Sequence, residues 1–290
     1  MITIFSNPRP FTGEFDLLQR NAIRSWVQLQ RDCQVILIND EENTTEAVAR
    51  ELGVEFISVY KSNEFGTPLL DDVFEQVRKL ARYDVLAQVN ADILLFPDFV
   101  DVLLEQGRRS GPEGFLLLGR RWNLEVTEPL DFKQPNWRER LVARARSEGH
   151  LHGPSGMDYW VFPKQVPICP PPFCVGRPGM DSWLVFHAKS RGMPVLDATD
   201  AITIIHQQHG YPKQRAPHFE VECERNIALA GGRANMLSLR EADWLITPAG
   251  DRERPPFARA MLSFLSGFAT WRNLLAAKRW TQRQLAGSSR

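Results

Sequence analysis

One stretch, residues 85–100 (VLAQVNADILLFPDFV), constrains the fold of this chain more than any other. Its apolar start, 85–89, predicts a buried strand that runs into a small polar cluster containing Asn90 and Asp92. A second apolar run follows, and Pro97 indicates the start of a helix. Open α/β sheets bind ligands beyond the carboxyl ends of their strands, so an acidic residue in this place suits a ligand better than a core.

Asn90 and Asp92 are two positions apart, so on extended backbone their side chains point the same way. An amide oxygen and a carboxylate on one side can hold a hard divalent cation, which in turn can hold a diphosphate. The same residues also fit a turn in which Asp92 caps the next element. Spacing alone does not separate the two interpretations.

The first hundred residues alternate apolar strands with helical patterns, which indicates an α/β fold. We expect a mostly parallel central sheet with helices on both faces. Gly53 is expected to end the second helix, and Pro68 to lie in the first turn of the third. The predicted strands cover 1–6, 34–38, 54–59 and 85–89, and the predicted helices cover 14–30, 44–53 and 67–80.

Polar residues follow three of these strands at the point where each strand ends. If the strands are neighbours, these side chains line one edge of the sheet. A base and ribose could lie over the polar residues that follow the first two of these strands, and a metal-bound diphosphate could lie at those that follow the third. Taken alone, the second exit equally fits an ordinary helix cap. The three exits are Ser6-Asn7, Asn39-Asp40 and Asn90-Asp92.

Composition narrows the function classes. The 290 residues are 43% apolar, enough for a substantial core, and 35 basic residues balance 35 acidic ones at a pI near 7.0. A chain without net charge does not resemble a nucleic-acid binder. The four cysteines form no CxxC pair, no signal peptide is recognisable, and no apolar run reaches transmembrane length. We therefore expect a cytoplasmic protein with reduced thiols.

Together these features resemble the nucleotide-sugar half of a GT-A glycosyltransferase, closest to family 2. The segment RNAIRSWVQLQ carries Ser25 and Gln28 where the family has an "Sl..Q" pattern. INDEENTTE is similar to the family's "DDGSTD" segment, with Asp40 at the base-binding position. VNADILLFPDF is similar to the DxD motif followed by "l.pdf", with Asn90 replacing the first Asp and leaving one carboxylate fewer. The resemblance extends over roughly residues 1 to 210 in element order.

The resemblance implies an inverting transfer of a sugar from a nucleotide-diphosphate donor to an acceptor hydroxyl, with Mn²⁺ or Mg²⁺. Asp181 matches the acidic residue that serves as catalytic base, and a carboxylate can take the acceptor proton. His206 matches the late histidine that completes the metal site with Asn90 and Asp92, and His209 is the fallback. By itself, Asp181 also fits a helix N-cap.

The resemblance also implies contacts to the sugar and the acceptor. The loop around 150–158 abuts both in the family, so His152 and Asp158 are candidates for sugar hydroxyl contacts. Trp183 is a candidate floor of the sugar pocket. From the residues alone, His152 and Asp158 equally fit turn positions, and Trp183 equally fits the core.

Other cationic residues have two interpretations each. Arg120 and Arg121 follow a predicted strand, where they could clamp a phosphate or form a solvated edge. Lys213 and Arg215 could close over a diphosphate or belong to a solvated loop. Further predictions are a basic surface helix in the region 124–150, strands over 159–162 and 195–205, and a helical region over 219–245.

We divide the chain into a GT-A domain, 1–248, and a tail, 249–290. Within the domain, 1–100 is the nucleotide-binding half and 101–248 the acceptor and catalytic half. From Asp251 the tail has seven Arg, one Lys and two acidic residues, a net charge of +6. Its mixture of aromatic, aliphatic and basic residues predicts an amphipathic helix. Such a helix could lie on the inner membrane face, on a partner subunit or against the domain.

Two other functions are alternatives to a glycosyltransferase. A sugar-phosphate nucleotidyltransferase should carry a Gly-rich phosphate loop after the first strand, and FSNPRPFTGEF has a single Gly. A non-catalytic nucleotide-sugar-binding module with a degraded metal site is favoured by Asn90. The combination of Asp92, Asp181 and His206 counts against that module. The sequence leaves the sugar, the nucleotide and the acceptor open.

Overall fold

The computed structural model of the chain describes residues 1–29, 33–39, 44–58, 61–210 and 217–255. Its centre is one large sheet whose strands are β1 (Ile2–Ser6), β2 (Cys33–Asn39), β3 (Glu55–Ser58), β4 (Val85–Val89), β6 (Leu116–Leu118), β9 (Tyr159–Pro163), β10 (Val195–Asp197), β12 (Trp244–Leu245) and β13 (Arg252–Glu253). The strand order is β13-β12-β10-β6-β9-β4-β1-β2-β3. Five of the eight pairings are parallel, which confirms the predicted mostly parallel sheet.

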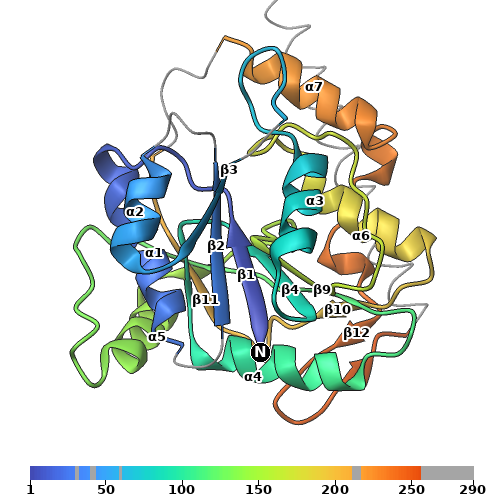
Figure 1. The fold of residues 1–290 in the computed structure, drawn as a ribbon. Coiled ribbons are helices and arrows are strands. Elements are labelled where there is room, and N and C mark those ends of the chain that lie inside the picture. Colours follow the sequence, from blue (N-terminus) through green and yellow to red (C-terminus); the bar gives the residue numbers. More distant parts are fainter. Residues whose placement is uncertain (30–32, 40–43, 59–60, 211–216, 256–290) are drawn as a thin grey trace, which may run out of the picture.

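Helices cover both faces of this sheet, as predicted (Figure 1). Successive side chains of a strand point to opposite faces. Ile2 and Ile4 of β1 therefore pack on one side with α1, α2 and α4, and Phe5 packs on the other with α3 and α6. The helices are α1 (Gly13–Val27), α2 (Thr45–Leu52), α3 (Leu70–Leu80), α4 (Pro97–Arg109), α5 (Trp137–Ser147), α6 (Met180–Ser190) and α7 (Phe219–Leu229).

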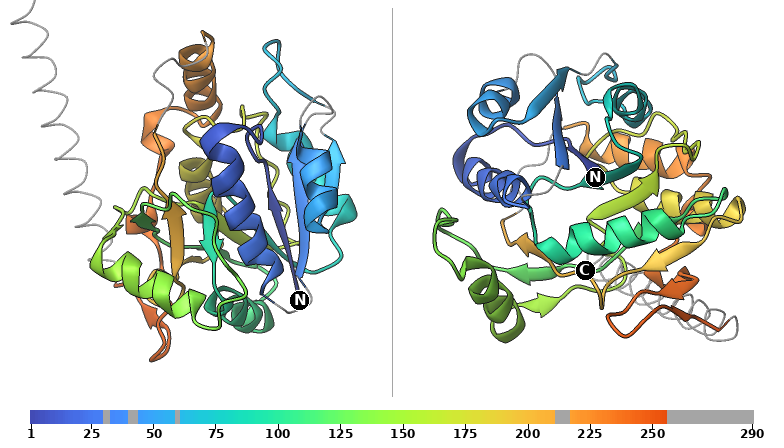
Figure 2. Two further views of the ribbon diagram at one scale, coloured as in Figure 1. Left: turned by 90° about the vertical axis from the view of Figure 1, so that its left-hand side faces the viewer. Right: turned by 60° about the horizontal axis from the view of Figure 1, so that its bottom comes forward.

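A second, four-stranded sheet was not foreseen from the sequence. Its order is β5-β11-β7-β8, and α5 covers it through Trp137 and Leu141, which pack on Leu94 and Ile205. Figure 2 shows α5 at the periphery of the molecule, away from α3. Its strands are β5 (Ile93–Leu95), β7 (Trp122–Leu124), β8 (His150–Leu151) and β11 (Ile204–Gln207).

Two predicted helix boundaries are wrong. The helix expected from residue 67 begins at Leu70, because the carbonyl of Pro68 accepts a hydrogen bond from the backbone N–H of Val175 (3.0 Å). The helical region expected over 219–245 ends at Leu229, because Gly231 and Gly232 have φ of 81° and 98°. It continues as two short 3₁₀ turns, Arg233–Asn235 and Leu239–Glu241, and then as β12. The predicted Gly53 cap of α2 is confirmed, with φ of 69°.

The end of the described chain belongs to the central sheet. β13 pairs antiparallel with β12, and Arg254 forms an ion pair with Asp197 (3.2 Å). The boundary proposed between residues 248 and 249 therefore falls between two paired strands. The amphipathic part of the predicted tail, 256–290, lies outside the described residues. Among the residues described, no helix combines the length and hydropathy needed to cross a membrane.

Candidate functional site

The carboxyl ends of β2, β1 and β4 lie side by side. The polar residues that follow these strands were predicted to line one edge of the sheet, and that prediction required this arrangement. In Figure 1 these strands run upward from the labelled N-terminus, so this edge is at the top. The Ser6 hydroxyl donates to the carbonyl of Val89 (2.6 Å), and the Asn7 amide donates to the carbonyl of Ile38 (3.1 Å). Both side chains thus join neighbouring strands, and Ser6 is fully buried. Asp40, Lys213 and Arg215 lie outside the described residues.

Three predicted metal ligands converge beside this edge. β11 pairs antiparallel with β5 so that His206 lies opposite Ile93, directly after Asp92 in the chain. The Nε2 atoms of His206 and His209 lie 3.5 Å and 3.2 Å from the same Oδ2 of Asp92. One ligand atom from each residue lies within 4.8 Å of the other two. The pairing of β5 with β11 therefore brings these three residues together. We call Asp92, His206 and His209 the cation cluster, because they are candidate ligands of one metal cation.

Buried amides that the sequence analysis missed fix the backbone of this cluster. The Gln207 side chain donates to the carbonyls of Asp92 (3.1 Å) and Leu18 (2.8 Å), and accepts from Asn21 (3.1 Å). Gln207 and Asn21 are almost fully buried. The available signal was an amide beside His206 in an apolar strand, and another on the apolar face of the first helix. Such polar residues are retained inside a core when they satisfy backbone groups.

The two histidines hold the carboxyl of Asp92 in its charged form. Burial disfavours the charged form of Asp92, but hydrogen bonds from His206 and His209 outweigh it and hold the pKa of this carboxyl well below its usual range. The hydrogen bond to Asp92 raises the pKa of His209. Among the described residues, Oδ1 of Asp92 and Nδ1 of His206 are buried without a hydrogen-bond partner. A carboxylate oxygen and two imidazole nitrogens form a donor set that binds divalent transition-metal ions.

Asn90 and Asp92 do not lie on the extended backbone that the sequence analysis assumed. The backbone here is a turn, closed by a hydrogen bond from the N–H of Ile93 to the carbonyl of Asn90 (3.1 Å). The alternation of an extended strand therefore does not apply. The Asn90 amide instead donates to Oδ1 of Asp158 (2.8 Å). A metal-binding role for Asn90 remains a prediction.

Asp158 is the centre of a second polar group. It is buried and forms an ion pair with Nη1 of Arg121 (2.5 Å), while its Oδ2 has no hydrogen-bond partner among the described residues. The Arg120 Nε donates to the carbonyl of His152 (2.5 Å), and the His152 ring is only partly buried. Arg120 and Arg121 are thus anchored to this loop, which excludes a simple solvated edge.

Asp181 lies in the first turn of α6 and is not the N-cap. Gly179, with φ of 119°, takes the N-cap position. Oδ1 of Asp181 accepts a hydrogen bond from the N–H of Ser182 (2.9 Å). Burial raises the pKa of Asp181 to about 6, and the nearby charge of Asp158 adds to the effect. A carboxyl that titrates near neutral pH is suited to general-base chemistry.

Trp183, two residues further along α6, belongs to the core. Its ring packs edge-on against Phe173 (centroids 5.5 Å apart) and stacks on His187 (4.6 Å). A contact between Trp183 and the sugar stays a prediction.

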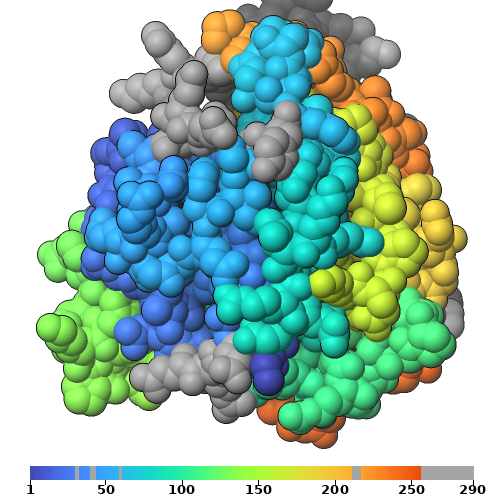
Figure 3. Space-filling view, viewed as in Figure 1, coloured from blue at the N-terminus to red at the C-terminus, as the bar shows by residue number. Residues whose placement is uncertain are grey.

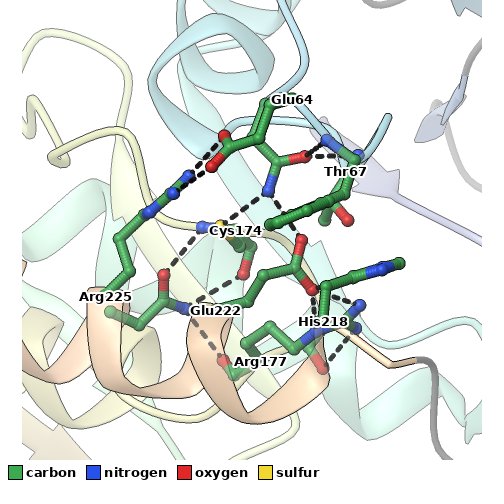
Figure 4. A network of polar contacts seen from close by, with 11 residues as sticks. Glu64, Thr67, Cys174, Arg177, His218, Glu222 and Arg225 are labelled. Atoms are coloured by element: carbon green, nitrogen blue, oxygen red, sulfur yellow. Dashed lines mark hydrogen bonds and ion pairs between the residues drawn. The ribbon is translucent and has the colours of Figure 1, made fainter.

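The loop that precedes Asp181 is attached to α7 (Figure 4). Asn226 is fully buried; its side-chain Oδ1 accepts from the N–H of Cys174 (2.8 Å), and its side-chain Nδ2 donates to the backbone carbonyls of Cys174 (3.0 Å) and Arg177 (3.4 Å). Glu222, also fully buried, accepts from Asn63 (2.6 Å) and from Nε of Arg177 (2.6 Å). Figure 3 shows the 61–67 loop against α7 at the top of the molecule. No local pattern in the sequence indicates this network.

Comparisons with known proteins bear on the fold. No protein-family model matches the sequence. No curated protein matches it either. Among solved structures, TarS residues 1–349 from S. aureus in complex with UDP-GlcNAc is 11% identical and covers 79% of this chain and 66% of that chain, with a TM-score of 0.50.

A glucosyl-3-phosphoglycerate synthase from Mycobacterium tuberculosis, in complex with Mg²⁺ and UDP, is 16% identical and covers 88% of this chain and 87% of that chain, with a TM-score of 0.48. The likeness to TarS concerns the arrangement of the sheet and its helices. The strand order and this likeness show that the chain has the GT-A fold that its sequence motifs predicted.

Proposed function

We propose that this protein is a glycosyltransferase that moves a sugar from a nucleotide-diphosphate donor to an acceptor hydroxyl. The observation that carries the proposal is the convergence of Asp92, His206 and His209 at the carboxyl edge of the sheet. This edge is where open α/β sheets bind nucleotides. The GT-A fold and the binding of UDP-sugar by TarS support the same donor class.

The cation cluster supports a divalent metal cofactor. Asp92, His206 and His209 would hold the ion, and Mn²⁺ suits their two imidazoles better than Mg²⁺ does. When bound, the ion would offset the negative charge that develops on the departing nucleoside diphosphate. Ser6 and Asn7 stand at the neighbouring strand ends, where the nucleoside would lie.

Asp181 is proposed as the general base of an inverting transfer. Its carboxylate would take the proton of the acceptor hydroxyl while the hydroxyl oxygen forms a bond to the anomeric carbon of the donor. The bond from that carbon to the diphosphate breaks, and the diphosphate leaves with the electron pair. The raised pKa of Asp181 supports this role because a base poised near neutral pH binds a proton more readily than an ordinary carboxylate. Asp158, held by Asn90 and Arg121, is proposed to contact sugar hydroxyls.

Calorimetric titration of UDP, GDP and dTDP into the protein tests the donor site. Binding of one nucleotide that depends on Mn²⁺ and is abolished in Asp92→Asn would support the proposal and name the nucleotide. No binding of any nucleotide, with or without Mn²⁺, would contradict it. An Asp181→Asn variant that binds the donor as wild type does but transfers no sugar would support the base. Unchanged turnover would remove Asp181 from that role.

A further inference from the structure

We infer that Arg9 contacts the phosphates of the nucleotide donor, so that a fixed protein cation acts on the diphosphate beside the cation cluster. The inference deepens the proposed function and rests on it. Arg9 lies in the loop that leaves β1 at the carboxyl edge of the sheet, and no feature of the sequence had singled it out.

The backbone of Arg9 is fixed from both sides by one buried residue. The N–H of Arg9 donates to Oε1 of Gln19 (2.6 Å), and Nε2 of Gln19 donates back to the carbonyl of Arg9 (2.9 Å). Gln19 is almost fully buried in α1. The pair of hydrogen bonds holds the loop against the helix while Arg9 itself remains exposed. The residue is therefore an accessible cation on a rigid support.

The side chain of Arg9 is directed toward the cation cluster through one aromatic ring. Its guanidinium lies over the ring of Phe15, 4.7 Å from the centroid. Phe15 in turn meets His209 edge-on, with centroids 5.0 Å apart, and His209 contacts Asp92. In the part of the chain that the structure describes, the guanidinium rests on this ring and not on a carboxylate. A stacked Arg keeps its planar donors in one orientation, the form that binds phosphate in two places.

The cation cluster has less negative charge than the family pattern implies, so a positive side chain beside it can act on a bound diphosphate. Asn90 stands where the resemblance expects an acidic residue, and it points toward Asp158. The cluster consequently contains a single carboxylate, Asp92. A diphosphate carries several negative charges, and a positive side chain near it in a partly buried site strengthens its binding. Arg9 is placed to supply that charge.

The test compares two ligands and two variants. In the presence of Mn²⁺, the nucleoside diphosphate that wild type binds among UDP, GDP and dTDP is titrated by calorimetry. Its matching nucleoside is measured by saturation-transfer NMR. We expect Arg9→Gln to weaken diphosphate binding about tenfold, the loss of one good charged contact, and to leave nucleoside binding unchanged. Arg24→Gln, at a half-buried Arg near the other end of α1, is the matched control and should change neither.

Each outcome decides between the two proposals. If wild type binds no nucleotide, the proposed function fails and this inference fails with it. If wild type binds a diphosphate and Arg9→Gln binds it equally well, the inference is overturned while the proposed function stands. If Arg9→Gln weakens nucleoside and diphosphate by the same factor, Arg9 acts on the base, ribose or loop, and its assignment to the phosphates is wrong. Arg9→Lys should bind with intermediate strength if the planar fork matters.

Discussion

Replacing Asp181 by Asn should stabilise the protein at alkaline pH and leave its stability unchanged in acid. Burial raises the pKa of Asp181 from 3.8 to about 6. Below the lower value the carboxyl is protonated in both the folded and the unfolded chain, so it contributes nothing. Above the higher value it is charged in both, and the folded state carries the full penalty of a buried charge. The two pKa values correspond to about 3 kcal/mol of unfolding free energy.

Urea denaturation of wild type and Asp181→Asn at pH 4 and pH 8 measures this difference. Asparagine is neutral throughout, and its side-chain oxygen can still accept from the N–H of Ser182. We expect the variant to gain about 0.5 kcal/mol at pH 4, where the carboxyl of the unfolded chain is already partly ionised, and about 3 kcal/mol at pH 8. The other titrating groups are common to both proteins, so they cancel in the difference. Asp84→Asn, at an exposed carboxylate, should show the same small effect at both pH values.

An equal stability change at both pH values would refute the reasoning, because it would mean that the charge of Asp181 is not penalised in the fold. A gain at pH 8 together with lost sugar transfer would show a group kept for chemistry at the expense of stability.

Three further predictions concern the cation cluster and the α7 network. His209→Ala should bind the nucleotide with equal affinity in Mn²⁺ and in EDTA, and a retained metal effect in calorimetry would contradict the assigned ligand. Asn226→Ala should lower the unfolding free energy by about 2–4 kcal/mol, since it breaks two buried hydrogen bonds and a third that is partly buried, whereas Asn235→Ala, with one, should cost less in urea denaturation. Glu222→Ala should cost about 3–5 kcal/mol because it leaves Arg177 unpaired, and a loss below about 1 kcal/mol would count against that ion pair.

Much of the nucleotide-binding half follows from local patterns. The apolar runs that become β1, β2 and β4 are bounded by clear polar exits, and a parallel arrangement places those exits together. Asp92 could be named because it follows an apolar strand, and His206 because the resemblance to the GT-A family implies a histidine at the end of a late strand. The helices α1 and α3 were recognisable from the sequence. The predicted start of α3 is too early, because the carbonyl of Pro68 accepts a hydrogen bond from Val175 and the helix begins only at Leu70.

Local sequence patterns do not predict the contacts that complete the site. The direction of Asn90 depends on a turn that alternation cannot foresee, and its partner Asp158 is 68 residues away. The strands of the second sheet are two to four residues long, too short to give a period. The roles of Arg121 and Gln207 can be assigned only from their hydrogen-bond partners, which are distant in the sequence.

The pairing of β5 with β11 has a consequence for folding. It joins residues more than a hundred positions apart in the chain, since the contact between Asp92 and His209 spans 117 residues. Closing so large a loop is entropically costly and slow, and it is complete only when the intervening elements have found their places. The unfolded chain therefore offers no preformed chelate, and an ion bound here at 100 times its dissociation constant would stabilise the native state by about 2.7 kcal/mol. Metal availability would then regulate how long this protein survives as well as how fast it works.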